Sequence, residues 1–295
     1  MGITYALLAM LAFATNIVIT RFALARMPVE AGFFIVLATN VVFPALLFAV
    51  ELGVRAAPYA WNWKGAGLFA IGGVVGTFLG RRFLFDTVKL LGPSRASVFH
   101  STAPAFALLA AWLLAGELLG PYELALMALV WLGLWLTQPR AGSLHALAPQ
   151  VLRKGFLAGL FTVAGFGFGN VLRGLAMRDW SEAALGTVIA SLAALACQFA
   201  VTRDWGRIGA QLRAADRSAL LLYTGCGVFT SLGSIFISLA MTRIEIALAV
   251  LVVHTTPLVI FPVSVFLLKN REELTGRTLS GAALVLAGIA LLALR

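Results

Sequence analysis

Charged residues are scarce in this sequence. Only 12% of its 295 residues are Asp, Glu, Lys or Arg, whereas 61% are hydrophobic, and the mean hydropathy is +0.97. Soluble domains carry about 25% charged residues, so this chain lacks the polar groups to cover a surface in water. A surface that contacts lipid needs no such cover. The scarcity of charge therefore predicts an integral membrane protein whose surroundings are the lipid bilayer.

Residues that bind metals or act as nucleophiles are also few. The chain has two cysteines and three histidines, and Cys197 and Cys226 lie in apolar runs outside any CxxC pair. No Ser/His/Asp, HExxH or phosphate-loop pattern occurs. The run GFGFGN at 165–170 lies in an apolar segment with no preceding strand, which argues against a dinucleotide loop. We therefore expect no metal, no cofactor and no enzymatic activity.

Long polar segments are missing as well. One membrane span needs about 20 residues, so ten spans with short connectors leave little chain for a soluble catalytic domain. The net charge is +10, but the basic residues form no cluster with interleaved aromatic residues. We interpret them as cationic flanks of membrane spans and expect no nucleic-acid partner.

Ten apolar runs are bounded by charged residues, Pro or Trp. We predict a membrane-spanning helix in each of them: 3–25, 29–52, 65–88, 94–116, 121–138, 154–173, 182–202, 216–240, 244–268 and 275–294. Backbone amides in lipid must bond within their own segment, which favours helices. Four tryptophans lie at the predicted span edges, as in an interfacial aromatic belt: Trp61, Trp63, Trp180 and Trp205. The fold class is therefore an all-α polytopic membrane protein.

The two halves of the chain resemble each other. At an offset of 153 residues the same residue type recurs at five pairs of positions: Gly72 and Gly225, Gly80 and Gly233, Phe83 and Phe236, Thr102 and Thr255, and Pro104 and Pro257. The contexts HSTAP at 100–104 and VHTTP at 253–257 are alike. Glu117 corresponds to Glu272 if two residues are inserted. The sequence thus predicts an internal repeat.

The polar stretch near the middle of the chain separates the two copies. We expect a first five-helix repeat at 1–138, a connector at 139–153 and a second five-helix repeat at 154–295. Because five crossings is an odd number, the second copy must insert upside down relative to the first. Inverted repeats around a midplane site recur among transporters.

The residues 76–119, GTFLGRRFLFDTVKLLGPSRASVFHSTAPAFALLAAWLLAGELL, carry a family resemblance. The glycine-containing third helix, SRAS at 94–97, the Pro-containing fourth helix and the Gly-Glu that ends it resemble the ten-helix EamA-type branch of the drug/metabolite transporter superfamily. The segment GAALVLAGIALL at 281–292 resembles the same family. The resemblance implies two inverted five-helix repeats, a central cavity and movement of small metabolites, often outward. Family members usually have apolar or aromatic residues where this chain has Arg81 and Arg82.

Arg81 and Arg82 lie well inside the third run. A charged residue at mid-bilayer costs about 2.5–3.5 kcal/mol and normally faces protein or water. Arg82 and Asp86 are four residues apart on one helix face, whereas Arg81 is rotated by about 100° from Arg82 and has no acid three or four residues away. We hypothesise that Arg82 and Asp86 form a structural charge pair and that Arg81 meets an anionic group of the substrate. Alternatively, both arginines extend to the membrane surface or pair with carboxylates.

Prolines stand at matching places in the fourth and ninth runs. Pro104 and Pro257 each remove a backbone N–H and displace the carbonyl four residues earlier, on His100 and Val253. Nearby threonine hydroxyls could bond such carbonyls. We expect these kinks to line a cavity and to bend as gates, although a kink without a binding role is the alternative.

Small residues accompany these kinks. Gly80 and Gly233 occupy matching positions, and Gly72, Gly76 and Gly80 repeat every four residues. Small residues let helices approach closely and slide. We expect Gly80 and Gly233 to act as gating positions, with tight packing alone as the alternative.

Polar side chains inside the spans are candidates for a substrate site. His100 and His254 could carry a proton, because histidine titrates near neutrality, but buried histidines need no such role. The expected substrate-binding set is Arg81, Asn16, His100, Thr102, Asn170, Ser234, His254 and Thr255. Any of these residues can instead bridge neighbouring helices, which is worth only about 0.6 kcal/mol on average.

Basic residues are distributed unequally between the two sides of the membrane. Six Lys and Arg residues flank spans on the side of both termini and fourteen on the opposite side, with Arg81 and Arg82 completing the 22. The positive-inside rule then predicts that the termini lie outside the cytoplasm, whereas members of the resembling family usually have cytoplasmic termini.

These observations predict a transporter of the cytoplasmic membrane of a prokaryote. We expect it to move a small metabolite by alternating access, with amino acids or other organic acids favoured by Arg81, and to act as an exporter. The alternative is an efflux transporter for drugs or lipid-like amphiphiles, which requires an aromatic cavity. The sequence leaves the oligomeric state, monomer or homodimer, open.

Overall fold

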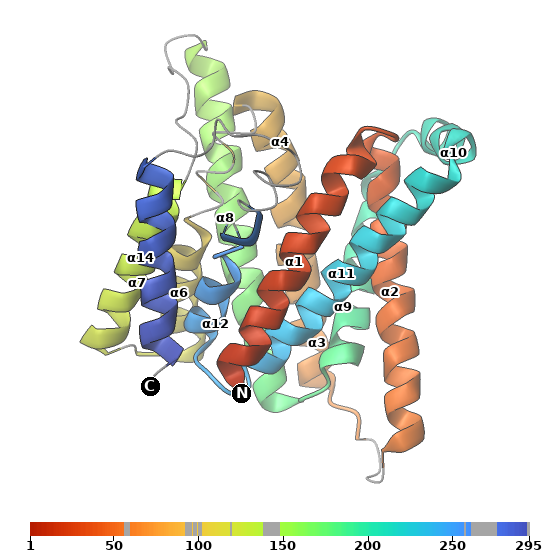
Figure 1. The fold of residues 1–295 in the computed structure, drawn as a ribbon. Coiled ribbons are helices and arrows are strands. Elements are labelled where there is room, and N and C mark those ends of the chain that lie inside the picture. The colour runs from red at the N-terminus through yellow and green to blue at the C-terminus, as the bar shows by residue number, and fades with distance from the viewer. Residues whose placement is uncertain are drawn as a thin grey trace. The chain divides into compact units, whose positions relative to one another are not determined.

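The computed structural model describes residues 1–55, 60–91, 96, 99, 102–118, 120–137, 148–256, 258–260 and 276–293. The regular secondary structure within these ranges is helical (Figure 1). The elements are α1 (Gly2–Leu24), α2 (Val29–Val54), α3 (Trp63–Gly72), η1 (Gly73–Gly80), α4 (Arg81–Leu91), α6 (Ala103–Ala115), α7 (Pro121–Thr137), α8 (Pro149–Asp179), α9 (Ala183–Val201), α10 (Trp205–Ala214), α11 (Arg217–Ala240), α12 (Ile246–Val253) and α14 (Gly276–Ala293).

The predicted all-helical membrane fold is confirmed. Six of the described helices are long and apolar enough to cross a membrane, with α3, η1 and α4 forming one continuous helix at Trp63–Leu91. Four shorter apolar helices fall in the remaining predicted runs. α10 was not predicted, because its ten residues include two arginines and two glycines and form no apolar run.

Short polar caps set where several helices begin. Asn62 accepts a hydrogen bond from the Gly65 N–H at 2.9 Å and starts α3, and Asp216 accepts one from the Ala219 N–H at 2.7 Å and starts α11. Each side-chain oxygen satisfies an amide that has no partner within its helix. At the other end of α6, Gly116 adopts a φ of 63°, the left-handed conformation that glycine tolerates best.

The chain forms two compact units, each drawing on both halves of the sequence. Unit 1 comprises Met1–Val74 and Leu172–Arg243, and unit 2 comprises Val75–Val171 and Ile244–Arg295. The chain therefore passes from one unit to the other three times: inside η1, inside α8 and between α11 and α12.

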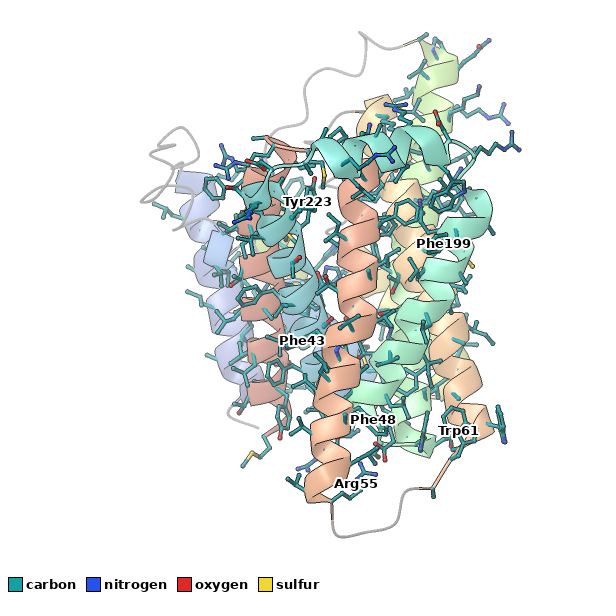
Figure 2. The ribbon with its side chains drawn as sticks, turned by 90° about the vertical axis from the view of Figure 1, so that its right-hand side faces the viewer. Phe43, Phe48, Arg55, Trp61, Phe199 and Tyr223 are labelled. Carbon is teal, nitrogen blue, oxygen red and sulfur yellow. The ribbon has the colours of Figure 1, made fainter. Side chains whose placement is uncertain are left out.

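In unit 1, α1 packs along α11, and α2 lies between α11 and α9 (Figure 2). Glycines bring these helices together. Gly32 of α2 lies against the ring of Tyr223, whose hydroxyl donates to the Met27 carbonyl at 2.9 Å. Gly73, where η1 begins, lies directly against the backbone of Ala190 in α9.

An ion-paired cluster closes one end of unit 1. Arg55, which follows α2, donates to both carboxylate oxygens of Glu182 at 2.6 and 2.9 Å and also pairs with Glu51 (Figure 2). These two carboxylates, Glu182 first, raise the pKa of the Arg55 guanidinium above its ordinary value. Trp180 donates its indole N–H to the Ala60 carbonyl at 3.1 Å. The connector after α2 is thereby held to the start of α9.

In unit 2, the first part of α8 is a glycine-rich packing surface. A Cβ at Gly165 would lie 2.9 Å from Gly80 Cα, and a Cβ at Gly76 would lie 3.2 Å from Gly169 Cα, so η1 and α8 approach each other through their glycines. Gly167, on another face of α8, lies against the Ala107 backbone of α6. The GFGFGN run is therefore a helical contact surface, in agreement with its exclusion as a dinucleotide loop.

α7 and α14, the last spans of the two halves, lie side by side in unit 2 (Figure 1). Gly133 of α7 faces Val285 and the Gly281 carbonyl, and Gly288 of α14 faces Val130. Elsewhere on this pair, large apolar side chains are exposed, including Trp131, Trp135 and Leu286. Such exposure is expected where the surrounding solvent is lipid.

Candidate functional site

α12 ends inside its predicted span. After its last residue the backbone forms tighter turns, in which hydrogen bonds reach the carbonyl three residues earlier. The Thr255 N–H and hydroxyl both donate to the Val252 carbonyl, at 3.1 and 2.6 Å. Thr256 bonds the Val253 carbonyl in the same way, at 3.2 and 2.6 Å. The Val253 carbonyl is the one that Pro257 was expected to displace, and a threonine hydroxyl bonds it as expected.

The first half shows the same local structure. The Thr102 N–H and hydroxyl both donate to the Phe99 carbonyl, at 2.9 and 2.7 Å, and these residues correspond to Thr255 and Val252 at the offset of 153. Pro104 then lies in the first turn of α6, where its missing N–H is not needed. Pro104 thus accompanies the start of a helix, whereas the sequence had predicted a kink in a helix interior. His100 and Pro257 lie outside the described residues.

Within unit 2, a buried carboxylate links the end of α6 to the start of α12. Glu117, just after α6, is 8% exposed and accepts hydrogen bonds from the Ile246 and Ala247 amides at 2.9 and 3.4 Å. A negative charge at a helix N-terminus satisfies free amides and complements the helix dipole. Sequence reasoning used Glu117 only to align the repeats, because the amides that it caps lie about 130 residues further on.

The two breaks lie well inside the predicted spans 94–116 and 244–268. At a rise of 1.5 Å per residue, Thr255 lies roughly 13 Å beyond Ile246 along α12, and Thr102 lies roughly 20 Å from the end of α6. Both values fall within a hydrocarbon core about 30 Å thick. Because α6 and α12 pack together in unit 2, two matched interruptions of the helical backbone occur in neighbouring spans. Irregular backbone at this depth requires protein or a water-filled cavity beside it.

The arginine pair follows η1 directly. η1 is a π-helix of eight residues, and π-helical segments are rare and often occur at functional sites. Arg81 is half-buried and takes part in an interaction within the protein, whereas Arg82 is exposed. Gly80, the predicted gating residue, packs against Phe166 of α8.

The predicted pairing of Arg82 with Asp86 is not formed in this conformation. The ion pairs recorded among the described residues do not include these two side chains, although both are described. Residues one turn apart pair only when both side chains turn toward each other, and the exposed Arg82 does not meet the half-buried Asp86. The division of roles between Arg81 and Arg82 stays a prediction.

Asn170 lies nine residues before the end of α8, in the part of this helix that belongs to unit 2. Its side chain is half-buried and makes no hydrogen bond with the part of the chain that the structure describes. A polar amide inside a span needs a partner, since an unsatisfied amide in an apolar environment costs several kcal/mol. Water or a substrate could supply that partner.

Asn16 and Ser234 are in unit 1. The Thr20 hydroxyl donates to the backbone carbonyl of Asn16 at 2.7 Å and to its side-chain oxygen at 3.5 Å, and the Ser238 hydroxyl donates to the backbone carbonyl of Ser234 at 2.8 Å. Gly233 lies against the ring of Phe13. These contacts are those of neighbouring turns and packed helices. His254 of unit 2 ends α12 and has an interaction within the protein.

A further polar contact joins α2 and α11. The side-chain nitrogen of Asn40 faces the backbone carbonyls of Val36 and Gly227. It donates to the Gly227 carbonyl at 2.8 Å and to the Ser231 hydroxyl at 3.1 Å. Asn40 is 3% exposed, so this network fixes two helices within unit 1 and has no visible access for a solute.

Comparison with known proteins agrees with this organisation. The model of the EamA-like transporter family matches residues 1–138 and again residues 153–294. Among solved structures, 24 chains match. One crystal structure of a protein shares 19% sequence identity and superposes with a TM-score of 0.71 over 97% of each chain. No significant match is found among curated proteins.

Proposed function

Because the chain belongs to the EamA-like transporter family, within the drug/metabolite transporter superfamily, we propose that this membrane transporter moves a small organic anion such as an amino acid or another organic acid. Members of this family are not enzymes. Two matched copies of an odd number of spans are consistent with inverted repeats, the architecture that supports alternating access around a central site. We further propose that transport is outward.

The observation that carries the anionic substrate is the exposed guanidinium of Arg82 within the continuous helix Trp63–Leu91. A charge inside a span normally faces water or a pathway. This exposure leads us to exchange the roles that the sequence suggested for the two arginines. We propose that Arg82 contacts the substrate carboxylate and that the half-buried Arg81, already engaged with the protein, adds positive potential. The half-buried Asn170 and Thr102 are the polar groups that would line the pathway, whereas Thr255 is fully buried in this conformation.

Reconstitution into liposomes tests this function. Vesicles that contain the purified protein should exchange a radiolabelled amino acid or dicarboxylic acid for unlabelled solute faster than vesicles without it. Transport of an amphipathic cation in place of organic acids would contradict the proposal and favour the alternative drug or lipid-like substrate. A screen of metabolites for thermal stabilisation of the detergent-solubilised protein would select the solutes, because a ligand of the folded state raises stability with the logarithm of its concentration.

We propose that the protein resides in the cytoplasmic membrane of a prokaryote with both termini outside the cytoplasm. The support is the excess of fourteen basic residues over six at the span ends of the opposite side. Alkaline phosphatase fused after Arg295 should therefore be active, and a fluorescent protein that folds only in the cytoplasm should be dark at the same position. The reverse pattern would place the termini in the cytoplasm.

A further inference from the structure

α10 (Trp205–Ala214) belongs to unit 1 and lies across one end of it, beside the start of α2 (Figure 2). It occupies the connector between α9 and α11, residues 202–216, whereas the corresponding connector between α2 and α3 spans only residues 55–62. Asp204 caps its first turn by accepting from the Arg207 N–H at 3.0 Å. The helix is thus a specific addition to one side of the second repeat.

The apolar face of α10 packs against the protein, with Trp205 remaining 41% exposed. The Trp205 ring stacks on Phe199 with centroids 4.8 Å apart and lies 5.2 Å from Phe34. Ile208 is buried, and Leu212 packs against the core formed by α1, α2 and α11. α10 is therefore docked firmly, and its other face is the one available to partners.

That outer face carries two arginines separated by small residues. Arg207 and Arg213 are exposed and six residues apart, so they lie about 120° apart around the helix, with Ala210 midway between them. Gly206 and Ala214 are the other exposed residues on this face. Side chains this small leave the space between the two guanidinium groups open to an approaching anion.

The charge around α10 is positive. Arg203 and Arg217 flank the helix, and neither they nor Arg213 form an ion pair within the described part of the chain. Arg207 has only a long contact of 3.9 Å with Glu30, between exposed side chains. Asp204 and Asp216 each accept a hydrogen bond from a helix N-terminus. Residues 202–217 thus carry four positive and two negative charges.

The position of α10 between two spans predicts that it lies at the level of the lipid headgroups. It directly follows the end of the α9 span at Val201 and precedes the α11 span that begins at Arg217. A partly exposed tryptophan next to basic residues at the end of a span is typical of the membrane–water interface. Basic residues at this level attract anionic lipids.

We propose that the outer face of α10 binds the phosphate headgroup of an anionic phospholipid between Arg207 and Arg213. This inference depends on the membrane insertion of the chain and is independent of the substrate that is transported. The membrane leaflet on this side would then stabilise unit 1 at the junction of α2, α9 and α11.

The test compares lipid binding to matched variants of the full-length protein. Native mass spectrometry of the detergent-solubilised protein should show retention of phosphatidylglycerol over phosphatidylcholine. The double variant Arg207→Gln/Arg213→Gln should bind phosphatidylglycerol more weakly, by about 5-fold for each arginine and roughly 30-fold in total. Arg207→Lys/Arg213→Lys should keep most of it. The control Arg178→Gln/Arg243→Gln removes the same charge from exposed positions at the other end of unit 1 and should bind as the wild type does.

Three results would overturn the proposal. Equal retention of both lipids by the wild type would show that α10 has no selectivity for an anionic headgroup. An equal loss in the control variant would assign the effect to overall charge. Competition by millimolar inorganic phosphate as strong as that by the lipid would identify a soluble anion as the ligand. Unchanged melting temperatures without added lipid would show that the variants are folded.

Discussion

Replacing Arg82 with glutamine is expected to weaken the transport of a carboxylate substrate by about 10- to 100-fold. A hydrogen bond to a charged group contributes about 1.5–3 kcal/mol, and glutamine keeps the length of the side chain while removing the charge. The measurement is the concentration dependence of exchange in proteoliposomes. Because Arg82 is exposed and has no ion pair among the described residues, its loss should leave the melting temperature nearly unchanged.

Three further variants separate the roles of the charges. Arg82→Lys should recover part of the activity, since it restores a positive charge without the planar guanidinium. Arg81→Gln should lower the melting temperature as well as transport, because Arg81 has an interaction within the protein. Arg243→Gln, at an exposed position after α11, serves as the control and should transport normally. Wild-type kinetics for Arg82→Gln, together with loss of transport in Arg81→Gln, would assign the anion site to Arg81.

A methyl group added at Gly73 is expected to destabilise the protein strongly. A Cβ at this position would overlap the Ala190 carbonyl oxygen and would stand 2.6 Å from Ala190 Cα. Because these atoms belong to the backbone of α9, no rotation of a side chain can relieve the clash. Overpacking of this kind costs typically 1–3 kcal/mol and occasionally more. We expect the melting temperature in detergent to fall by several degrees for Gly73→Ala.

The matched control is Gly67→Ala, six residues earlier in the same continuous helix. Gly67 is exposed, and nothing lies within 4 Å of a Cβ built there. Alanine is favoured over glycine inside a helix by about 1 kcal/mol, so this variant should melt at the same or a higher temperature. If Gly73→Ala were as stable as Gly67→Ala, the close approach of η1 to α9 would be disproved.

Sequence patterns anticipated the features that depend on local composition. Apolar runs longer than about 17 residues predict membrane spans because lipid leaves the backbone no other hydrogen-bond partner. The threonines before Pro104 and Pro257 were recognised through the repeat, and Thr102 and Thr255 bond carbonyls in the same geometry. The start of α10 could also have been found, since Asp204 before a tryptophan is an N-cap signal.

Contacts between distant segments were beyond such patterns. The spacing of Arg82 and Asp86 predicted a pair, but the exposure of Arg82 is set by the packing around α4. The glycines at 72, 76 and 80 suggested one flat stripe, whereas η1 replaces α-helical spacing by π-helical spacing there, and Gly73 and Gly76 face different helices.

By itself, the sequence determined that this protein is embedded in a membrane, that its spans are helical and that its two halves repeat. Each of these features depends on hydrophobicity and spacing along the chain. The tertiary structure alone decided that Glu117 caps α12, that Gly73 touches α9 and that Arg82 is exposed. These outcomes depend on the close approach of residues far apart in the chain. The free energy of such a contact depends on both segments and on how the fold places them, so neither segment predicts it alone.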